Sequence, residues 1–393
     1  MKILIVNKFL YPRGGDCIHA LSVGRLLAEA GHEVRYYAMS YPDNLPCADE
    51  AYFAPAVSFS GGLGALLRAA GRTLFGQGTG KGFIRLLHDF RPDVVHLHNI
   101  HSYLSPHLAQ LARQQDIRVV WTLHDYKLLC PTYNFLRKSQ PCEACLTGKW
   151  PVVRHRCMKQ SLPASLLAYL EANRWSRPHL QGLTDAFVCP SHFMKQKMEQ
   201  GGFPASKLHV VHNFTTAPAT PPQPREARNY CLYVGRLSPE KGVDTLLNAA
   251  TRLPHLPLLI AGTGPQEEAL HQRFGQHAHI RFLGQCTPQK VDELMAGARM
   301  LVIPSVWYEN NPLSLIEALA HGTPVVGSRM GGIPELLTEA NGLLVQPGNA
   351  NDLQLAIAQA WDTSFDYSRI AGEALQHFSG QRYLDEILKI YQP

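Results

Sequence analysis

The sequence has no long hydrophobic run and no obvious export signal. No stretch of eighteen or more apolar residues occurs among its 393 residues, which argues against a membrane-spanning helix. Lys2 is followed directly by a strand pattern rather than by a long apolar segment, so we expect a cytoplasmic protein. The net charge is only +6 and no known nucleic-acid reader module is present, so we expect no nucleic-acid partner.

The length and the position of the prolines predict two domains. A chain of 393 residues is too long for one core, and 45% hydrophobic residues are enough to fill two. Residues 215–224 contain four prolines, which interrupt regular structure and mark a connection. We therefore predict an amino-terminal domain (1–213), a linker (214–228), a carboxy-terminal domain (229–375) and a final helical segment (376–393).

Short apolar runs alternate with helical patterns in both predicted domains. Such alternation predicts an α/β fold with parallel sheets covered by helices on both faces, and ligands in the gap between two such layers. The predicted strands are Lys2–Val6, Val34–Ala38, Val94–Leu97, Val119–Leu123 and Ala186–Cys189 in the first domain, and Tyr230–Val234, Leu258–Ala261, Ile280–Leu283, Met300–Ile303 and Pro324–Gly327 in the second.

Two glutamates, Glu309 and Glu317, follow one of the predicted strands. Pro312 between them is typical of the first turn of a helix, and a spacing of eight residues would place both carboxylates roughly on one helix face. Free backbone N–H groups beside two carboxylates suit a ligand that carries both phosphates and hydroxyls, such as a sugar nucleotide. The alternative is an acidic helix start without a ligand.

A loop with two cations follows the predicted strand Tyr230–Val234. Gly235 allows a tight turn, and Arg236 and Lys241 lie at the strand's carboxyl end, where open α/β sheets bind ligands. Arginine and lysine are the usual partners of phosphate oxygens. The pair Gly14 and Gly15, before the first predicted helix, would allow a similar approach to an anion, although any tight turn can use such a pair.

Over nearly its whole length the chain resembles the retaining glycosyltransferases of family 4, which have the two-domain GT-B fold with two Rossmann-like domains facing across a cleft. The resemblance rests on five motifs. They are Gly14–Gly15, Gly235–Arg236 with Lys241–Gly242, Ala261–Gly264, the Glu309/Glu317 pair and Gly331–Glu335.

The resemblance implies roles for individual residues. Arg236 and Lys241 would hold the donor diphosphate without a catalytic metal, Glu309 would lie near the transferred sugar, and Glu317 would bind the ribose. His124, at the end of a predicted strand, would contact the donor sugar. The further donor-binding residues that we predict are Gly14, Gly15, Gly262, Gln285, Asn310, Asn311, Pro312 and Leu313.

Three further features of the sequence bear on the comparison with the family. Many members of the family have Gly-Phe-Gly where this chain has Asn310-Asn311-Pro312, which leaves the choice of hexose open. His98 is a candidate acceptor contact, with a buried structural histidine as the alternative. The resemblance also implies that the last helix crosses back onto the first domain.

Four of the nine cysteines gather in one insertion of the first domain, at about 126–160. Their spacing is symmetric, and a cytoplasmic chain should not rely on disulfides, so we predict a structural metal site, with zinc or an iron–sulfur cluster as the occupant. The alternative is four reduced thiols without a ligand. The predicted metal ligands are Cys130, Cys142, Cys145 and Cys157.

The same insertion is basic. Between Lys127 and Lys159 it holds seven lysines and arginines against one acidic residue, Glu143, together with several aromatic residues. Such a surface suits an anionic bilayer or a phosphorylated lipid-linked glycan, and the segment Leu63–Phe75 is a second amphipathic candidate. A solvated loop is the alternative.

These observations predict a hexosyltransferase that uses a UDP- or GDP-linked hexose and a glycan or lipid-linked acceptor. Bacterial surface polysaccharide or lipopolysaccharide assembly at the inner face of the cytoplasmic membrane is the setting that the resemblance implies. A nucleotide-sugar epimerase of GT-B type and a non-catalytic nucleotide-sugar-binding protein are the alternatives.

Overall fold

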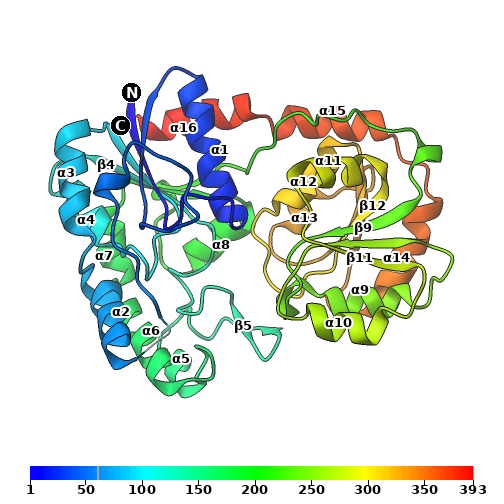
Figure 1. Ribbon diagram of the computed structural model, residues 1–393, viewed down its shortest axis with the longest axis horizontal. Coiled ribbons are helices and arrows are strands. Elements are labelled where there is room, and N and C mark those ends of the chain that lie inside the picture. The colour runs from blue at the N-terminus through cyan, green and yellow to red at the C-terminus, as the bar shows by residue number, and fades with distance from the viewer. Residues whose placement is uncertain (60–61, 393) are drawn as a thin grey trace. The chain divides into compact units, whose positions relative to one another are not determined.

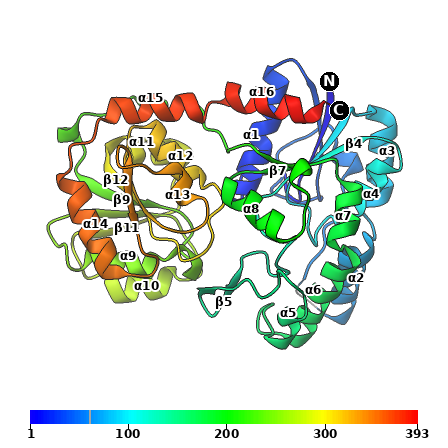
Figure 2. The same cartoon turned by 180° about the vertical axis from the view of Figure 1, so that it is seen from behind.

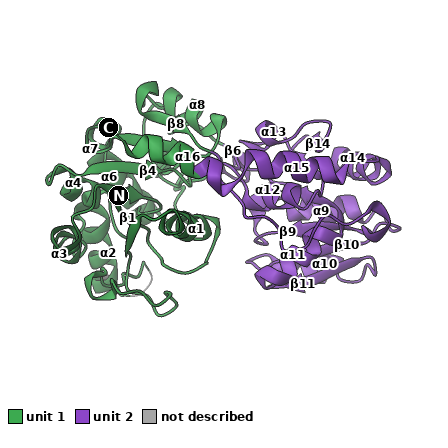
Figure 3. Cartoon of the chain, turned by 90° about the horizontal axis from the view of Figure 1, so that it is seen from above, with its two compact units in different colours: residues 1–135, 142–211, 384–393 green, residues 136–141, 212–383 purple. Residues whose placement is uncertain are grey.

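The computed structural model describes residues 1–59 and 62–392, without the side chain of Leu63. The chain forms two compact units, which Figure 3 colours separately. Unit 1 comprises Met1–Phe135, Cys142–Val211 and Leu384–Pro393, and unit 2 comprises Leu136–Pro141 and His212–Tyr383.

Unit 1 contains a six-stranded sheet in the order β2-β1-β3-β4-β7-β8, in which every pair is parallel. The strands are β1 (Lys2–Val6), β2 (Glu33–Tyr37), β3 (Val94–Leu97), β4 (Arg118–Thr122), β7 (Ala186–Cys189) and β8 (Leu208–Val210). The helices are α1 (Gly15–Glu29), α2 (Leu63–Phe75), α3 (Gly80–Phe90), α4 (His107–Arg113), α5 (Pro151–Arg154), α6 (Leu162–Arg174), α7 (Arg177–Leu183) and α8 (His192–Gln200), with short 3₁₀ turns at Glu50–Tyr52 and Ala205–Lys207. In Figures 1 and 2 the helices α2, α5 and α6 lie together at one end of this unit.

Unit 2 also has a six-stranded parallel sheet, in the order β11-β10-β9-β12-β13-β14. Its strands are β9 (Tyr230–Val234), β10 (Leu258–Ala261), β11 (Ile280–Gly284), β12 (Ala298–Ile303), β13 (Val325–Ser328) and β14 (Gly342–Val345). Its helices are α9 (Val243–Ala250), α10 (Glu267–Phe274), α11 (Pro288–Gly297), α12 (Leu313–Ala320), α13 (Ile333–Leu336), α14 (Ala350–Asp362) and α15 (Tyr367–His377), with 3₁₀ turns at Arg225–Ala227 and Pro239–Lys241.

The core of unit 2 has two layers because successive side chains of a strand point to opposite faces of the sheet. On β12, Met300 and Val302 pack into a cluster with side chains of α9 and α14. Leu301 and Ile303 pack into a second cluster, with side chains of α11, α12 and α15. Apolar residues at every strand position therefore place helices on both faces, as expected for buried parallel strands.

The structure confirms the predicted fold class: each unit is Rossmann-like and has a parallel sheet. Nine of the ten predicted strands lie within one residue of the observed ones at both ends, and β12 starts two residues earlier than predicted, at Ala298. The prediction missed β14 (Gly342–Val345), which begins with a glycine and has only three apolar residues in succession.

The boundaries differ in detail from those predicted. The main segment of unit 2 begins at His212, and the proline-rich segment 214–228 belongs to it rather than forming a free linker. Arg225 and Arg228 hold this segment in place by donating to the carbonyl oxygens of Trp361 and Ala298. The hairpin of β5 (Leu136–Arg137) and β6 (Gln140–Pro141) clusters with unit 2, although the predicted insertion was assigned entirely to the first domain.

The last helix, α16 (Gly380–Tyr391), belongs to unit 1 from Leu384 onward. The Tyr391 hydroxyl lies 2.6 Å from Nδ1 of His96 on β3, and the Arg118 guanidinium donates to the carbonyl oxygen of Ile390. Tyr391 and His96 are both buried. The end of the chain is therefore fastened to the central strands of the unit 1 sheet.

Candidate functional site

The strand order of unit 2 determines where its loops converge. β9 is the first strand of the six-stranded sheet, and its two neighbours, β10 and β12, are reached by connections that leave in opposite directions. A crevice opens at the carboxyl ends of the strands at such a switch point, and nucleotides bind there in open α/β sheets. The loop with Gly235, Arg236 and Lys241 follows β9, and the loop with Glu309 follows β12. Both predicted groups of donor-binding residues thus lie at one switch point.

Glycines allow the loops at this edge to pack backbone to backbone. A Cβ atom at Gly262 would lie 2.0 Å from the carbonyl oxygen of Gly235, and one at Gly242 would lie 2.0 Å from that of Pro304. Gly331 has φ +61°, and a Cβ atom there would lie 1.9 Å from the carbonyl oxygen of Glu309. The loops after β9, β10, β12 and β13 are therefore in direct contact, and at these positions only glycine fits without displacing the backbone.

Lys241 and Glu309 form an ion pair in which Nζ lies 2.7 Å from Oε1. Ser305 donates a second hydrogen bond to the same oxygen at 2.5 Å, and the ammonium lies 4.9 Å from the ring centroid of Trp307. Glu309 is buried, whereas Lys241 is partly exposed. Burial acts to raise the pKa of Glu309, but Lys241 and the hydrogen bonds outweigh it and lower the pKa below its ordinary value. Glu309 is therefore an ionised acceptor with a fixed orientation.

Arg236 is the cation of this group whose charge is not compensated. Its side chain is exposed, and it makes no hydrogen bond or ion pair with any residue that the structure describes. In the same loop, Lys241 is paired with Glu309 and Glu240 accepts a hydrogen bond from Ser238, so the Arg236 guanidinium is the group left to meet a ligand. A guanidinium in this state can donate in a bidentate manner to a phosphate.

Glu317 lies on α12, which begins at Leu313, whereas Glu309 lies in the loop before this helix. The expectation that eight residues of helix place both carboxylates on one face is therefore wrong, because only the second glutamate is helical. Burial raises the pKa of Glu317 to about 7, and no other charge contributes to this shift. The two carboxylates thus have different environments, and Glu317 titrates near neutral pH.

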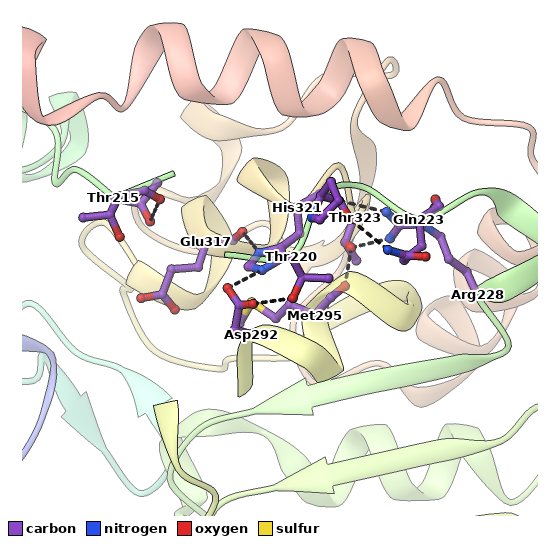
Figure 4. Close-up of polar contacts among 11 residues, drawn as sticks. Thr215, Thr220, Gln223, Arg228, Asp292, Met295, Glu317, His321 and Thr323 are labelled. Atoms are coloured by element: carbon purple, nitrogen blue, oxygen red, sulfur yellow. Dashed lines mark hydrogen bonds and ion pairs between the residues drawn. The ribbon is translucent and has the colours of Figure 1, made fainter. Parts of the chain in front are cut away.

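A polar network holds the end of α12 and the strand that follows (Figure 4). His321 lies 2.8 Å from the backbone oxygen of Glu317 and 2.9 Å from the carboxylate of Asp292. Arg228 is buried and donates to the backbone oxygen of His321 and to Thr323. In Figure 4 the Glu317 carboxylate points away from this network, so the network fixes the helix without occupying the carboxylate.

The remaining donor-binding candidates of unit 2 differ in their exposure and in their hydrogen-bond partners. Gln285 is exposed and accepts a hydrogen bond of 3.3 Å from Thr263, so its side chain is at the same edge of the sheet. Asn311 is buried, and its amide oxygen and backbone oxygen both accept hydrogen bonds from Asn213. The structure therefore uses the amide of Asn311 to fasten the start of unit 2. Pro312 caps α12, Leu313 is its first residue, and Asn310 precedes them in the loop.

In unit 1 the predicted residues also lie at the carboxyl ends of strands. Gly14 is the N-cap of α1 with an extended backbone (φ −169°), so this position does not require glycine, and Gly15 is the first helical residue. Asp16, in the first turn, pairs with Lys8 at 3.1 Å and accepts a hydrogen bond from Asn99 at 2.9 Å. Burial acts to raise the pKa of Asp16, but Lys8, His124 and these hydrogen bonds lower it to about 2.

His98 and His124 meet at this edge, with Nδ1 of His98 lying 2.9 Å from Nε2 of His124. His19 on α1 completes a group of three imidazoles whose ligand atoms lie within 4.8 Å of one another, a spacing that could hold a metal ion. Burial lowers the pKa of His124 to about 4, so this imidazole is neutral at pH 7. The structure thus joins His124 to His98, and a neutral His124 can exchange hydrogen bonds with hydroxyl groups.

The four thiols of the insertion are only partly brought together. The Cys130 and Cys145 thiols are buried and share a hydrogen bond, which lowers the pKa of Cys130. Cys142 and Cys157 are half-buried, and the charge of Cys157 acts on Cys145. In the part of the chain that the structure describes, these thiols do not form a group of three ligand atoms within 4.8 Å.

Sequence reasoning missed Ser305 and Trp307, which contact Glu309 and Lys241. It also missed Lys8 and Asp16, which pair with each other and whose charges act on His124. Ser305 and Trp307 lie between β12 and Glu309, so their position after a strand at the switch point was a usable signal. Lys8 lies two residues after β1 in the same way, and Asp16 directly follows Gly15. Their roles depend on pairings between distant residues, such as Asp16 with Asn99.

Two family models match the chain. The model described as Glycosyltransferase Family 4 matches residues 13–216, and the model described as Glycosyl transferases group 1 matches residues 219–376. Together they include every site residue described above except Lys8, and they leave out residues 1–12 and 377–393.

Characterised proteins with similar sequences include two mannosyltransferases. O-antigen chain mannosyltransferase B of Escherichia coli is 28% identical over 70% of this chain and 66% of its own length. Phosphatidyl-myo-inositol mannosyltransferase of Mycolicibacterium smegmatis is 24% identical over 96% of this chain and 90% of its own length.

Among solved structures, HepE of Anabaena in a complex with UDP and glucose has a TM-score of 0.69 and 18% identity, with 99% of each chain covered. A lipopolysaccharide outer core galactosyltransferase in its apo form has a TM-score of 0.65 and 19% identity, with 99% of this chain and 100% of that chain covered. At this level of identity the likeness supports the fold.

Proposed function

Because the chain belongs to glycosyltransferase family 4, we propose that it moves a hexose from a nucleotide sugar to a glycan or lipid-linked acceptor with retention of configuration. The observation that carries the proposal is the meeting of Arg236, Lys241 and Glu309 at the switch point of the unit 2 sheet. A diphosphate has the charge to engage the exposed Arg236, and the sugar has hydroxyls to engage the ionised Glu309. UDP- and GDP-linked hexoses are the donors that we expect.

The reaction we propose needs charge stabilisation more than covalent chemistry. The bond between the anomeric carbon and the β-phosphate oxygen breaks, and its electron pair leaves with the nucleoside diphosphate. The acceptor hydroxyl oxygen forms the new bond on the same face of the sugar, and its proton passes to the departing phosphate oxygen. Arg236 and Lys241 would stabilise the negative charge that grows on the diphosphate, while Glu317 would accept hydrogen bonds from the ribose. We expect transfer to persist in the presence of EDTA.

Similar proteins suggest a setting for this reaction. Because the relatives include an O-antigen chain mannosyltransferase, we place the chain in bacterial surface polysaccharide or lipopolysaccharide assembly. None of the described helices combines the length and hydropathy that a membrane crossing requires. The proposal is that the protein meets a lipid-linked acceptor at the inner face of the cytoplasmic membrane.

Replacing Arg236 with alanine tests the proposal. Loss of one fixed donor to the developing charge should lower kcat/KM about 100-fold, with radiolabelled UDP- and GDP-hexoses as donors. Arg252→Ala is the matched control, because Arg252 is also an exposed arginine of unit 2. It follows α9, however, and so lies at the amino ends of the strands rather than at their carboxyl ends. Near-normal transfer by Arg236→Ala, or an equal loss in both variants, would contradict the proposed role.

The same assay separates the alternative functions. A transferase releases nucleoside diphosphate in proportion to acceptor, whereas an epimerase changes the donor sugar without acceptor. A non-catalytic binding protein raises its Tm with the nucleotide sugar but releases no nucleoside diphosphate. Screening Tm against UDP, GDP and ADP sugars would also identify the base.

We propose further that the four thiols of the insertion hold a structural zinc ion. The contact between Cys130 and Cys145 supports the first two ligands, and the proximity of Cys157 to Cys145 supports a third. Zinc bound by thiolates would stabilise a segment in which Tyr133, Phe135 and Arg156 adopt positive φ angles. Elemental analysis of the purified protein should find about one zinc per chain. Cys142→Ser should lower the zinc content, and Cys286→Ser should leave it unchanged. Absence of metal from the unaltered protein would contradict the proposed site.

A further inference from the structure

One end of unit 1 exposes an unusual number of large apolar side chains. Seven of the fourteen large hydrophobic residues that are exposed in the described chain lie on α2, on α6 or at the N-cap of α5. The most exposed are Leu67 (64%), Phe75 (58%) and Trp150 (57%). A monomeric soluble protein rarely concentrates such residues without an interaction partner.

The helices that carry these residues are packed together. α6 contacts both α2 and α5, and the three helices lie side by side in Figures 1 and 2. Trp150 packs edge-on against Tyr169 of α6, with ring centroids 5.5 Å apart. The indole of Trp175, which directly follows α6, donates to the backbone oxygen of Thr73 on α2. We call the solvent-exposed side of α2, α5 and α6 the helical face.

On α6 the exposed residues form a stripe. Leu162, Leu166 and Leu170 recur every four residues and are 49%, 43% and 44% exposed, whereas Ser165 and Ala168 on the other side of the helix are buried. Polar residues would normally occupy the solvent side of such a helix. The leucines are therefore on the side that an outside partner could cover.

The charges on the helical face have one sign. Its exposed charged residues are Arg68, Arg154 and Arg174, with Arg156 and Lys159 in the turn between α5 and α6. The three helices contain a single acidic residue, Glu171, which is buried and paired with Lys127 at 2.8 Å. Exposed leucine, tryptophan and phenylalanine surrounded by lysine and arginine match the boundary of an anionic bilayer, where apolar groups enter the acyl region and cations meet the headgroups.

We infer that the helical face of unit 1 is a peripheral docking surface for an anionic lipid bilayer. The charge complementarity selects a bilayer over a second copy of the chain, because a copy would bring the same positive charges to the contact. The inference deepens the proposed function, since it assigns the surface on which a lipid-linked acceptor would be met. It does not depend on the donor site of unit 2.

Vesicle flotation tests the inference directly. The full chain should float with vesicles of phosphatidylcholine and 30% phosphatidylglycerol in 0.1 M salt, and should bind pure phosphatidylcholine at least tenfold more weakly. Leu166→Gln with Leu170→Gln should weaken binding by about tenfold for each leucine. Because both leucines are exposed, these changes should leave the Tm of the protein unaltered.

Matched controls come from unit 2. Leu355→Gln replaces a leucine that is 67% exposed on α14, and Arg252→Gln replaces an exposed arginine. Both should bind vesicles like the unaltered protein, whereas Arg154→Gln with Lys159→Gln should weaken binding about fivefold for each charge at low salt. Brominated lipids should quench the fluorescence of Trp150, and Trp150→Phe should remove that quenching.

The outcomes are distinguishable from failure of the proposed function. Arg236→Ala should bind vesicles normally, and the leucine variants should keep the Tm increase caused by a nucleotide sugar. No flotation with the anionic vesicles, or an equal loss in Leu355→Gln, would overturn the inference. A self-association equilibrium that the leucine variants abolish, without vesicle binding, would identify a second copy as the occupant and would also overturn it.

Discussion

The ion pair between Lys241 and Glu309 offers a test of how the candidate site is stabilised. Lys241→Met removes the ammonium but keeps a side chain of similar length, so the buried Glu309 carboxylate loses its charged partner. Breaking a buried pair in this way costs about 3–5 kcal/mol, and the partial exposure of Lys241 (26%) places the expected cost nearer 2–3 kcal/mol. For a unit of this size, that is a decrease of about 4–12 °C in Tm.

The pH dependence gives the expected loss a signature. With Lys241 present, the pKa of Glu309 is below its ordinary value, so the carboxylate stabilises the folded state above the unfolded-state pKa. Without Lys241, burial is the larger effect and raises that pKa, so the variant gains relative stability as the pH falls and Glu309 accepts a proton. The difference in Tm between the two proteins should therefore be largest near pH 7.5 and smaller near pH 4.5.

Calorimetry on three variants and the unaltered protein measures this effect. In addition to Lys241→Met, the double variant with Glu309→Gln removes the uncompensated charge and should recover most of the lost stability, while remaining inactive in transfer. Lys290→Met is the control, because Lys290 forms an exposed pair with Glu293 and should change the Tm little. If Lys241→Met unfolds like the unaltered protein, or if the double variant is less stable than the single one, the pair does not stabilise the site as we describe.

Three further predictions follow from the geometry. Gly331→Ala should lower the Tm and the rate of transfer together, because its Cβ atom would lie 1.9 Å from the carbonyl oxygen of Glu309. Gly372→Ala is the control, because a Cβ atom at Gly372 would meet open space. Equal Tm values for the two variants would contradict this prediction. Burial raises the pKa of Glu317 to about 7, so protonated Glu317 contributes stability at low pH that is lost as the pH rises through that value. Glu317→Gln should therefore be more stable than the unaltered protein at pH 8 by about 2 kcal/mol and not at pH 4.5. A pH-independent difference in urea unfolding would argue against this prediction. Tyr391→Phe should destabilise unit 1 by about 1–3 kcal/mol, because Nδ1 of the buried His96 would lose its hydrogen-bond partner. An unchanged free energy of unfolding in urea would show that this contact of α16 does not stabilise unit 1.

Much of the fold could be predicted because the relevant signals are local. Apolar runs such as Lys2–Val6 and Tyr230–Val234 are strands in the structure with the same ends. β14 was missed because its glycine leaves only three apolar residues in succession to indicate a strand. The segment 214–228 looked like a linker because its prolines are visible in the sequence, whereas the contacts of Arg225 and Arg228 that bind it to unit 2 are not.

The sequence by itself determined that the chain has two parallel α/β units and that cations and carboxylates follow particular strands. Those properties depend on periodicity, glycine and proline, which act over a few residues. Only the tertiary structure decided that β9 lies between β10 and β12, that Lys241 pairs with Glu309 rather than remaining free, and that Glu317 is buried enough to titrate near pH 7. It also placed the exposed leucines of α6 beside α2. These features arise from contacts between residues distant in the chain, whose free energies depend on burial and on strand order and so are absent from local sequence patterns.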